Sequence, residues 1–191
     1  MKTVEQSYEI LDPIDKDYIY KKIERISRVC YKSGDKTSDG SAERMVRNIV
    51  NHHHEAMIEH VSISVEFTTD RAIANELVRH RLCSFAQEST RYVNYKDGIE
   101  FIEPIFNHSD EHDQPYVEWA SVCSYGENAY SNMIASGCTP EEARSVLPLS
   151  TKTVLVMTAN LREWRHVFDL RVLGITGKPH PQVVQLLAPL L

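Results

Sequence analysis

Residues 61–92 read VSISVEFTTDRAIANELVRHRLCSFAQESTRY, and this stretch predicts a strand, a helix and a basic turn in immediate succession. In its first eight residues the apolar side chains occupy every second position, at Val61, Ile63, Val65 and Phe67. Polar side chains occupy the positions between them. A period of two is typical of a strand with one buried face, and an antiparallel sheet is the usual setting for such a strand.

The helix is expected to begin after Asp70, because an aspartate at this position can accept hydrogen bonds from the amides of the first turn. Apolar residues then recur at spacings of four within residues 73–82. Arg79 and Arg81 should therefore lie near the helix C-terminus, where the helix dipole favours cations. Residues 92–95 are predicted to be extended.

The turn at residues 79–92 combines arginine, hydroxyl and amide side chains within one short segment. Such a set can bind an anionic ligand that also accepts hydrogen bonds, such as a nucleotide phosphate. The alternative is that these arginines are solvated or paired with surface carboxylates, as most exposed arginines are.

The chain has 191 residues, of which 42% are hydrophobic and 25% charged, so we expect a single domain spanning residues 1–191. Its formal net charge of -6 argues against a nucleic-acid-coating surface and makes the basic turn more conspicuous. None of the four cysteines forms a Cys-x-x-Cys pair, and no apolar run is long enough to span a membrane. We therefore expect reduced thiols in a cytoplasmic protein with no membrane or nucleic-acid partner.

Two amphipathic helices are predicted before the strand, over residues 15–29 and from Ser41, which is expected to cap the second helix. The second helix ends in a segment rich in histidine, residues 52–60. A zinc site built on His52, His53, His54 and His60 is one alternative there. However, the usual His-Glu-x-x-His spacing would need a histidine where Ile58 stands, so no metal is our expectation.

Beyond the basic turn, residues 96–114 are predicted to be a loop, followed by a long helix from Tyr116 to a stop at Gly137, with a distortion at Gly126. Thr139, Pro140 and Glu142 form a capping box for a short helix. A β-branched run over residues 151–158 predicts a strand. Asn160 and Glu163 then cap another helix, and residues 174–191 should end in a short one.

The basic turn resembles the signature of the flavin-dependent thymidylate synthases, the ThyX type. In this chain the signature reads Arg79-His80-Arg81, then seven further residues, then Ser89, and then Arg91-Tyr92. Three further segments resemble this family: Ala143-Arg144-x-Val-Leu-Pro148, Asn160-x-Arg162 and Asp169-Leu-Arg171. The resemblance covers roughly residues 17–95 and 139–185. It implies an α+β fold of one domain, with a mainly antiparallel sheet flanked by helices.

The same resemblance implies reductive methylation of dUMP to dTMP, a step of nucleotide biosynthesis. 5,10-Methylenetetrahydrofolate would supply the carbon, and reduced FAD the hydride. NADPH would re-reduce the flavoprotein. The family also implies a homotetramer with active sites between subunits. Since the sequence lacks a Gly-x-Gly-x-x-Gly motif, FAD must be held by side chains rather than by a glycine-rich loop.

The resemblance assigns roles to individual residues. Arg171 is the expected catalytic residue, because an arginine beside the uracil ring would stabilise its ionised form and make C5 more nucleophilic. The expected FAD-binding residues are His54, Glu59, Arg79, His80, Arg81, Gln87, Asn160, Arg162 and His166. The expected dUMP-binding residues are Glu76, Arg79, Gln87, Glu88, Ser89, Thr90, Arg91, Arg144 and Arg171.

Two positions depart from the family pattern. Glu76 stands where a glutamine is expected, and its carboxylate would either repel the nucleotide phosphate or pair with a neighbouring arginine. Cys30 replaces a serine at a turn that contacts flavin. Ser89 has no base beside it in the sequence, so we expect a hydrogen-bonding role, and Cys83 is not expected to be a covalent catalyst. A nucleotide-binding regulator that keeps the pocket without turnover is an alternative that Glu76 would favour.

Overall fold

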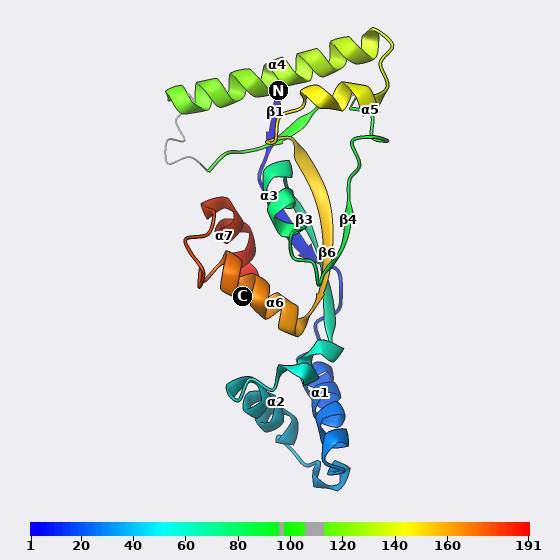
Figure 1. Ribbon diagram of the computed structural model, residues 1–191, viewed down its shortest axis with the longest axis vertical. Coiled ribbons are helices and arrows are strands. Elements are labelled where there is room, and N and C mark those ends of the chain that lie inside the picture. The colour runs from blue at the N-terminus through cyan, green and yellow to red at the C-terminus, as the bar shows by residue number, and fades with distance from the viewer. Residues whose placement is uncertain (96–97, 106–112) are drawn as a thin grey trace.

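The computed structural model describes residues 1–95, 98–105 and 113–191. A four-stranded antiparallel sheet runs through its middle (Figure 1), in the order β2 (Ser7–Ile10), β3 (Ser62–Asp70), β6 (Lys152–Asn160) and β4 (Ser84–Gln87). β3 and β6 pair over nine residues, from Ser62 opposite Asn160 to Asp70 opposite Lys152. The prediction of an α+β fold built on an antiparallel sheet is confirmed.

One face of this sheet is covered by α3 (Arg71–Leu77), α6 (Leu161–Arg171) and α7 (Pro181–Leu187), which leads into the 3₁₀ helix η4 (Ala188–Leu190). The period of two places the largest apolar residues of β3 and β6 on this face. The resulting core contains Phe67, Ile73, Leu77, Leu155, Met157, Val167 and Leu186. The indole of Trp164 packs there too and donates to the carbonyl of Ile63 at 3.0 Å, which ties α6 to β3.

A helical lobe lies at one end of the sheet (bottom of Figure 1). It contains α1 (Lys16–Cys30), the 3₁₀ helix η1 (Gly34–Lys36), α2 (Ser41–Asn51) and the 3₁₀ helix η2 (Glu55–His60). Its own apolar core consists of Ile23, Ile49, Ile58 and Val61. Because η2 leads directly into β3, this lobe sets the position of the histidine segment relative to the sheet.

The opposite end of the molecule carries α4 (Gln114–Ala135), α5 (Pro140–Ala143) and the 3₁₀ helix η3 (Arg144–Val146). Beneath them lies a parallel pair formed by β1 (Lys2–Val4) and β5 (Glu100–Ile102). Buried residues of this end are Ile99, Phe101, Cys123, Tyr130 and Ala143. Within the described ranges, no helix has both the length and the apolar character needed to cross a bilayer.

The predicted helix caps are confirmed at three sites. The Asp70 carboxylate accepts from the amide of Ile73 at 2.7 Å, and the Asn160 side chain accepts from the amide of Glu163 at 2.9 Å. Thr139 and Glu142 form the reciprocal capping box. These caps depend on residues only three positions apart, which is why the sequence alone identifies them.

The basic turn differs from the prediction. Helix α3 ends at Leu77 rather than near residue 82, so Arg79 and Arg81 lie in the connection that follows it. Residues 84–87 form β4, which pairs with β6, whereas residues 92–95 are not a strand. The predicted loop at 96–114 likewise contains β5. In both cases a hydrogen-bonded partner strand distant in sequence stabilises the extended segment, and a local pattern does not reveal such a partner.

Two smaller predictions are also wrong. Ser41 does not cap α2, because Gly40 takes the capping position with φ 68°, and the Ser41 hydroxyl instead accepts from the amide of Ser38. Gly126 does not distort α4, which is continuous there. A Cβ at Gly126 would lie 3.0 Å from Pro148 Cδ, so this glycine allows close packing. Of the acidic run at residues 110–113, residues 110–112 lie outside the described ranges.

Candidate active site

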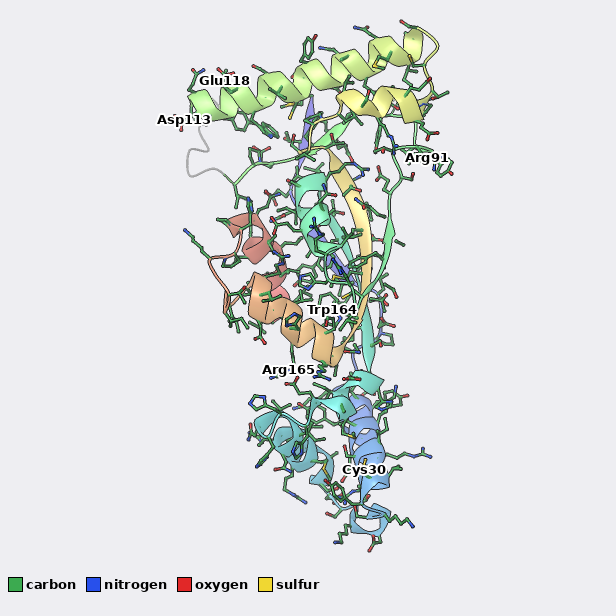
Figure 2. The ribbon with its side chains drawn as sticks, in the orientation of Figure 1. Cys30, Arg91, Asp113, Glu118, Trp164 and Arg165 are labelled. Atoms are coloured by element: carbon green, nitrogen blue, oxygen red, sulfur yellow. The ribbon has the colours of Figure 1, made fainter. Side chains whose placement is uncertain are left out.

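The predicted site residues gather at three places along the sheet. The Arg171 cluster comprises Glu76, His80, Glu163, His166 and Arg171, where the end of α3 meets α6. The η2 cluster comprises Glu55, Glu59, Asn160, Arg162 and Arg165, where η2 meets the start of α6. The distal turn comprises residues 88–91 with Glu141 and Arg144, on the side of α5 (Figure 2).

In the Arg171 cluster the guanidinium is held on three sides. Its Nη1 lies 3.0 Å from Oε2 of Glu76, its Nη2 donates to the Glu76 carbonyl at 3.3 Å, and its Nε donates to Nε2 of His80 at 3.1 Å. Of the two outcomes expected for Glu76, the structure therefore shows pairing with a neighbouring arginine. This pairing fixes the direction of the guanidinium and offsets its charge.

His80 is buried beneath this guanidinium, and its ring lies 6.3 Å from that of His166. Burial, together with the nearby charges of Arg171 and His166, lowers the pKa of His80 to about 4. His80 is therefore neutral at pH 7, with Nε2 accepting from Arg171. Its Nδ1 faces the buried Glu163 carboxylate at 3.7 Å, which favours the tautomer that has its hydrogen on Nδ1.

Cys83 lies close to this cluster and is partly buried. Burial, with a smaller contribution from the Glu163 carboxylate, raises the pKa of the Cys83 thiol to about 12. A thiol that stays protonated at neutral pH is a poor nucleophile. This agrees with the expectation that Cys83 is not a covalent catalyst.

The η2 cluster is a network of opposite charges around the start of α6. Arg162 pairs with Glu59 and with Oε2 of Glu55 at 3.7 Å, and Arg165 pairs with Oε1 of Glu55 at 3.3 Å. These side chains, with Asn160, His166 and Asp169, line a hollow of about 570 Å³. The hollow brings Glu59, Asn160, Arg162 and His166 together, four of the nine residues expected to bind FAD.

A second hollow, of about 640 Å³, lies between α1, α2 and η2, and Arg162 lines both. Met45, Ile49 and Met57 give it an apolar wall, and His54 lies among its lining residues. Cys30, the departure from the family pattern, also lines it. An apolar wall beside arginine and histidine fits a cofactor that joins flat rings to phosphates, so the side chains present are chemically suited to FAD.

The distal turn holds most of the expected dUMP-binding residues. Nε of Arg91 lies 2.9 Å from Oε1 of Glu141, and its Nη2 donates to Oε2 at 3.4 Å. Arg144 donates to the buried Thr90 hydroxyl at 3.4 Å, and the Ser89 hydroxyl accepts from the amide of Arg91. The turn is therefore rich in donors suited to an anion, and the Ser89 hydroxyl takes part in its internal hydrogen bonding.

Gln87, Arg79 and Arg81 belong to none of these three groups, and Glu88 follows Gln87 at the start of the distal turn. Gln87 on β4 donates to the Thr153 hydroxyl at 3.3 Å, and the Glu88 carboxylate accepts from the Tyr95 hydroxyl at 2.6 Å. Arg79 and Arg81 are exposed, and within the described part of the chain neither guanidinium has a hydrogen-bond or ion-pair partner. Two unpaired arginines next to His80 leave cations available for a phosphate-bearing ligand.

The family model described as thymidylate synthase complementing protein, Thy1, matches residues 16–183. The chain belongs to this family. The match spans the lobe, three of the four strands of the sheet (β3, β4 and β6) and all three groups of predicted site residues. It therefore covers the Arg-His-Arg signature as well as Arg144, Arg162 and Arg171.

Curated relatives of this Thy1 chain include the flavin-dependent thymidylate synthases of Pyrococcus furiosus and of Synechocystis sp. The first is 31% identical over 145 residues, or 74% of this chain and 59% of the relative. The second is 33% identical over 141 residues, or 68% of this chain and 66% of the relative. The chain thus spans somewhat under two thirds of the length of the curated relatives that it matches.

A solved structure with the same fold is the UMP/dUMP methylase PolB from Streptomyces cacaoi, bound with 5-Br dUMP. Its TM-score to this Thy1 chain is 0.78 at 25% identity, covering 97% of this chain and 88% of that one. The same protein bound with 5-Br UMP gives a TM-score of 0.80 at 23% identity. The sheet and both helical ends of the chain therefore follow a known architecture.

Sequence reasoning missed three acidic residues of these groups, Glu55, Glu141 and Glu163, and it also missed the pairing of Glu59 with Arg162. For Glu163 the sequence predicts only a helix-capping role. Their arginine or histidine partners are 50 to 110 positions away, so no local spacing identifies them. The alternative zinc site gains no support, because the described residues contain no group of three metal-ligating side chains.

Proposed function

We propose that this protein is an FAD-dependent thymidylate synthase, a methyltransferase that converts dUMP to dTMP. One observation carries the proposal: His80, from the Arg-His-Arg signature, accepts a hydrogen bond from Arg171 at 3.1 Å, although 91 residues separate them. Two motifs that resemble the same family are thus joined in one cluster. The match of residues 16–183 to the Thy1 family supports the proposal.

In this proposal the η2 cluster and the adjoining hollow hold FAD. Arg162, His54, Asn160 and His166 line these two hollows and offer donors to the cofactor, and Glu59 lines one of them as an acceptor. Gln87 and the signature residues Arg79, His80 and Arg81 complete the proposed set from outside the two hollows. When bound, FAD supplies the hydride, with NADPH as reductant and 5,10-methylenetetrahydrofolate as carbon donor. The protein's residues orient the ligands and exclude water from the space between them.

The nucleotide is bound through its phosphate and its base. Ser89, Thr90, Arg91 and Arg144 provide donors for the phosphate, with Glu88 and Gln87 beside them. Arg171 contacts the uracil ring and stabilises negative charge that develops on it. The guanidinium is held in place by His80 and Glu76, so little reorganisation is needed when the nucleotide arrives.

The distances along β6 suggest that one chain does not complete a site. The distal turn meets β6 at Val154, whose carbonyl accepts from the Glu88 amide. Asn160 of the η2 cluster lies six residues further along β6, which at ~3.4 Å per residue places it about 20 Å from Val154. The phosphate donors and the FAD donors of one chain are therefore far apart. We infer a homotetramer, acting in the cytoplasm, with sites assembled between subunits.

The first experiment is an absorption spectrum of the purified protein after incubation with FAD and desalting, followed by titration with dUMP. We expect a retained flavin band that shifts with dUMP, and dTMP formation once methylenetetrahydrofolate and NADPH are added. Loss of the flavin band on desalting would contradict the proposed cofactor.

A second candidate is a nucleotide-binding regulator that lacks turnover. The ion pair between Glu76 and Arg171 favours it, because a paired guanidinium stabilises an ionised uracil less well than a free one. The same assay separates the two: a flavin band that responds to dUMP, without any dTMP, would support the regulator.

A further inference from the structure

Arg71, the first residue of α3, lies outside the three groups of site residues and carries an unpaired buried nitrogen. Its Nε is the only buried side-chain nitrogen or oxygen, among the described residues, that lacks a hydrogen-bond partner. A buried donor without a partner destabilises a fold, so the presence of an arginine here calls for a reason other than stability.

Arg71 contacts both segments that carry the proposed phosphate donors. Its Nη2 donates to the carbonyl of Glu88 at 3.1 Å, directly before turn residues 89–91. Its backbone amide donates to the carbonyl of Leu149 at 3.0 Å, in the segment that follows η3 and Arg144. One residue of α3 therefore links the turn to the segment that presents Arg144.

Glu88 is held at three points. Its amide donates to the Val154 carbonyl at 2.9 Å, its carbonyl accepts from Arg71, and its carboxylate accepts from the Tyr95 hydroxyl at 2.6 Å. Tyr95 is itself fixed, because its ring packs edge-on against the buried ring of Tyr130 with centroids 5.8 Å apart. The chain therefore leaves Glu88 in one direction, which sets the course of the residues that follow.

The Glu88 carboxylate faces away from the donors of the turn. Glu88 and Tyr95 line a hollow of about 680 Å³, and residues 89–91 are not among its described lining residues. A carboxylate turned toward a phosphate would repel it. Burial, together with the hydrogen bond to Glu88, raises the pKa of Tyr95, so its hydroxyl stays protonated and keeps donating at neutral pH.

We propose that Arg71 and Tyr95 are positioning residues for the nucleotide. Arg71 fixes the backbone at Glu88 so that the donors of residues 89–91 face the phosphate, and Tyr95 keeps the Glu88 carboxylate away from it. Both side chains act through Glu88 rather than on the ligand. Donors that are fixed before the ligand arrives bind it with a smaller loss of conformational freedom. This inference rests on the proposed function, because it takes the distal turn as the phosphate site.

The test first separates affinity from turnover. KM for dUMP and kcat are measured on the full chain loaded with FAD, as wild type, Arg71→Met and Arg44→Met. Arg44 is the matched control because it also lies near the start of a helix, α2, and donates to a backbone carbonyl, that of Asp39 at 3.5 Å. We expect KM to rise at least about tenfold in Arg71→Met with kcat within about twofold, since phosphate donors bind substrate and transition state alike. Arg44→Met should behave as wild type.

The nucleoside 2′-deoxyuridine then reports on the phosphate, because it lacks one. Calorimetric titration of Arg71→Met should show dUMP bound at least about tenfold more weakly than by wild type, and 2′-deoxyuridine bound equally well. If Arg71 only stabilised the fold, its loss would weaken both ligands together.

Tyr95→Phe is the second variant, in case Arg71→Met does not fold. It removes one hydroxyl and keeps the ring that packs on Tyr130. We expect it to bind dUMP at least about threefold more weakly and 2′-deoxyuridine as wild type does. Equal losses for the two ligands in both variants, or no loss in either variant, would overturn the inference alone. Failure of the wild-type protein to bind dUMP would overturn it together with the proposed function.

Discussion

At the scale of single residues, Arg171 connects helix α6 to Glu76 at the end of α3 and to His80 of the Arg-His-Arg signature. Substitution of Arg171 by alanine removes the donor expected at the uracil ring and leaves the Glu76 carboxylate and His80 Nε2 without their partner. We expect the variant to retain FAD, because the η2 cluster is intact, and to form dTMP at least about a hundredfold more slowly. The flavin spectrum and a dTMP assay on the same sample check both statements.

Arg171→Lys is the informative companion variant. Lysine keeps the positive charge but lacks the planar fork that contacts Glu76 and His80 together. We therefore expect it to remain far below wild-type activity. Full activity in Arg171→Ala would refute the assigned role.

His80 gives a prediction about pH. Its folded-state pKa of about 4 lies below the ordinary value of 6.5, so between these two pH values the unfolded chain binds a proton that the folded chain does not. The contribution of His80 to stability is complete above about pH 6.5 and is lost as pH falls to about 4. The total is roughly 3 kcal/mol. Urea unfolding of wild type and His80→Gln across this range should show wild type losing more stability.

His52→Gln, the same substitution at an exposed histidine, is measured alongside as the control. Comparison of variants is needed because carboxylates also titrate in the lower part of this range. Parallel curves for wild type and His80→Gln would show that folding does not lower the pKa of His80 and would contradict this prediction.

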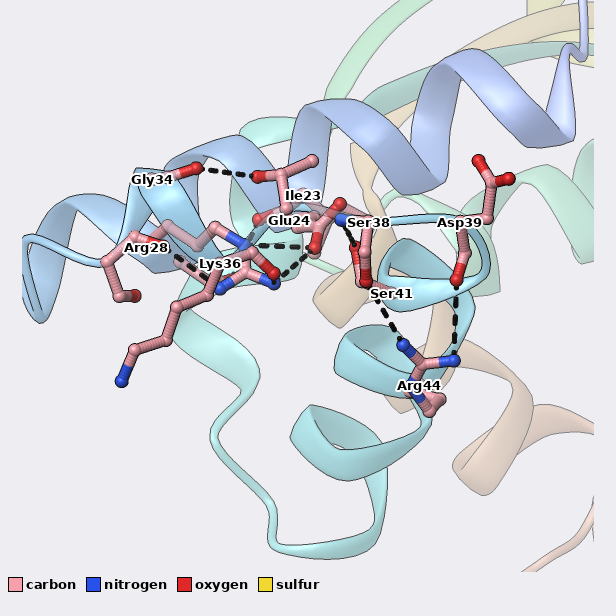
Figure 3. A network of polar contacts seen from close by, with 12 residues as sticks. Ile23, Glu24, Arg28, Gly34, Lys36, Ser38, Asp39, Ser41 and Arg44 are labelled. Atoms are coloured by element: carbon pink, nitrogen blue, oxygen red, sulfur yellow. Dashed lines mark hydrogen bonds and ion pairs between the residues drawn. The ribbon is translucent and has the colours of Figure 1, made fainter.

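At the scale of elements, a buried arginine of α1, paired with a glutamate of the same helix, connects α1 to the loop before α2 (Figure 3). Arg28 donates to Oε1 of Glu24 at 2.9 and 2.7 Å, and also to the carbonyls of Ser33 and Lys36. Burial by itself would raise the pKa of Glu24, but hydrogen bonds from Ser41 and Arg28 outweigh it and lower the pKa. One arginine thus fixes a connection that has little apolar packing of its own.

Arg28→Ala should lower the free energy of unfolding by about 3–5 kcal/mol, because it leaves the Glu24 carboxylate buried without its cation. The double variant Glu24→Leu/Arg28→Met should lose less than this single variant. Arg47→Ala, which breaks the exposed pair with Glu43, should cost about 1 kcal/mol or less. Urea unfolding measures all three, and equal losses for Arg28→Ala and Arg47→Ala would contradict this account.

The same substitution bears on cofactor binding. Ser27 and Cys30, which flank Arg28 on α1, line the hollow assigned to FAD. We therefore expect Arg28→Ala to release FAD more readily on desalting, whereas Arg47→Ala should retain it as wild type does.

At the scale of the whole molecule, the separation of the phosphate donors from the FAD donors predicts complementation between chains. Arg91→Ala and Arg162→Ala should each abolish activity alone, yet co-expression of the two should restore activity. A site that takes one contribution from each of two chains would be intact in about a quarter of random assemblies. The expected recovery is therefore about a quarter of wild-type activity in a dTMP assay.

The matched control is co-expression of Arg91→Ala with Arg144→Ala. Both arginines belong to the distal turn, where Arg144 bonds to Thr90, so a chain with either defect supplies a damaged turn. No activity should return. Absence of recovery in the Arg91→Ala and Arg162→Ala mixture would instead place a whole site within one chain.

The sequence by itself determined the features that depend on neighbouring residues. The alternation from Val61 to Phe67 identified a strand, Asp70, Thr139 and Asn160 marked the starts of helices, and the signature from Arg79 to Tyr92 pointed to the family. Side-chain direction and helix capping are set within a few positions, so a local pattern carries them.

Only the tertiary structure decided which charged groups meet. Residues 84–87 are a strand because β6 pairs with them, and Glu76 faces Arg171 because α3 and α6 pack on the same face of the sheet. The neutral state of His80 follows from burial beneath that same pair. Such contacts join residues separated by up to about a hundred positions, and their existence depends on how the whole chain closes rather than on any spacing within it.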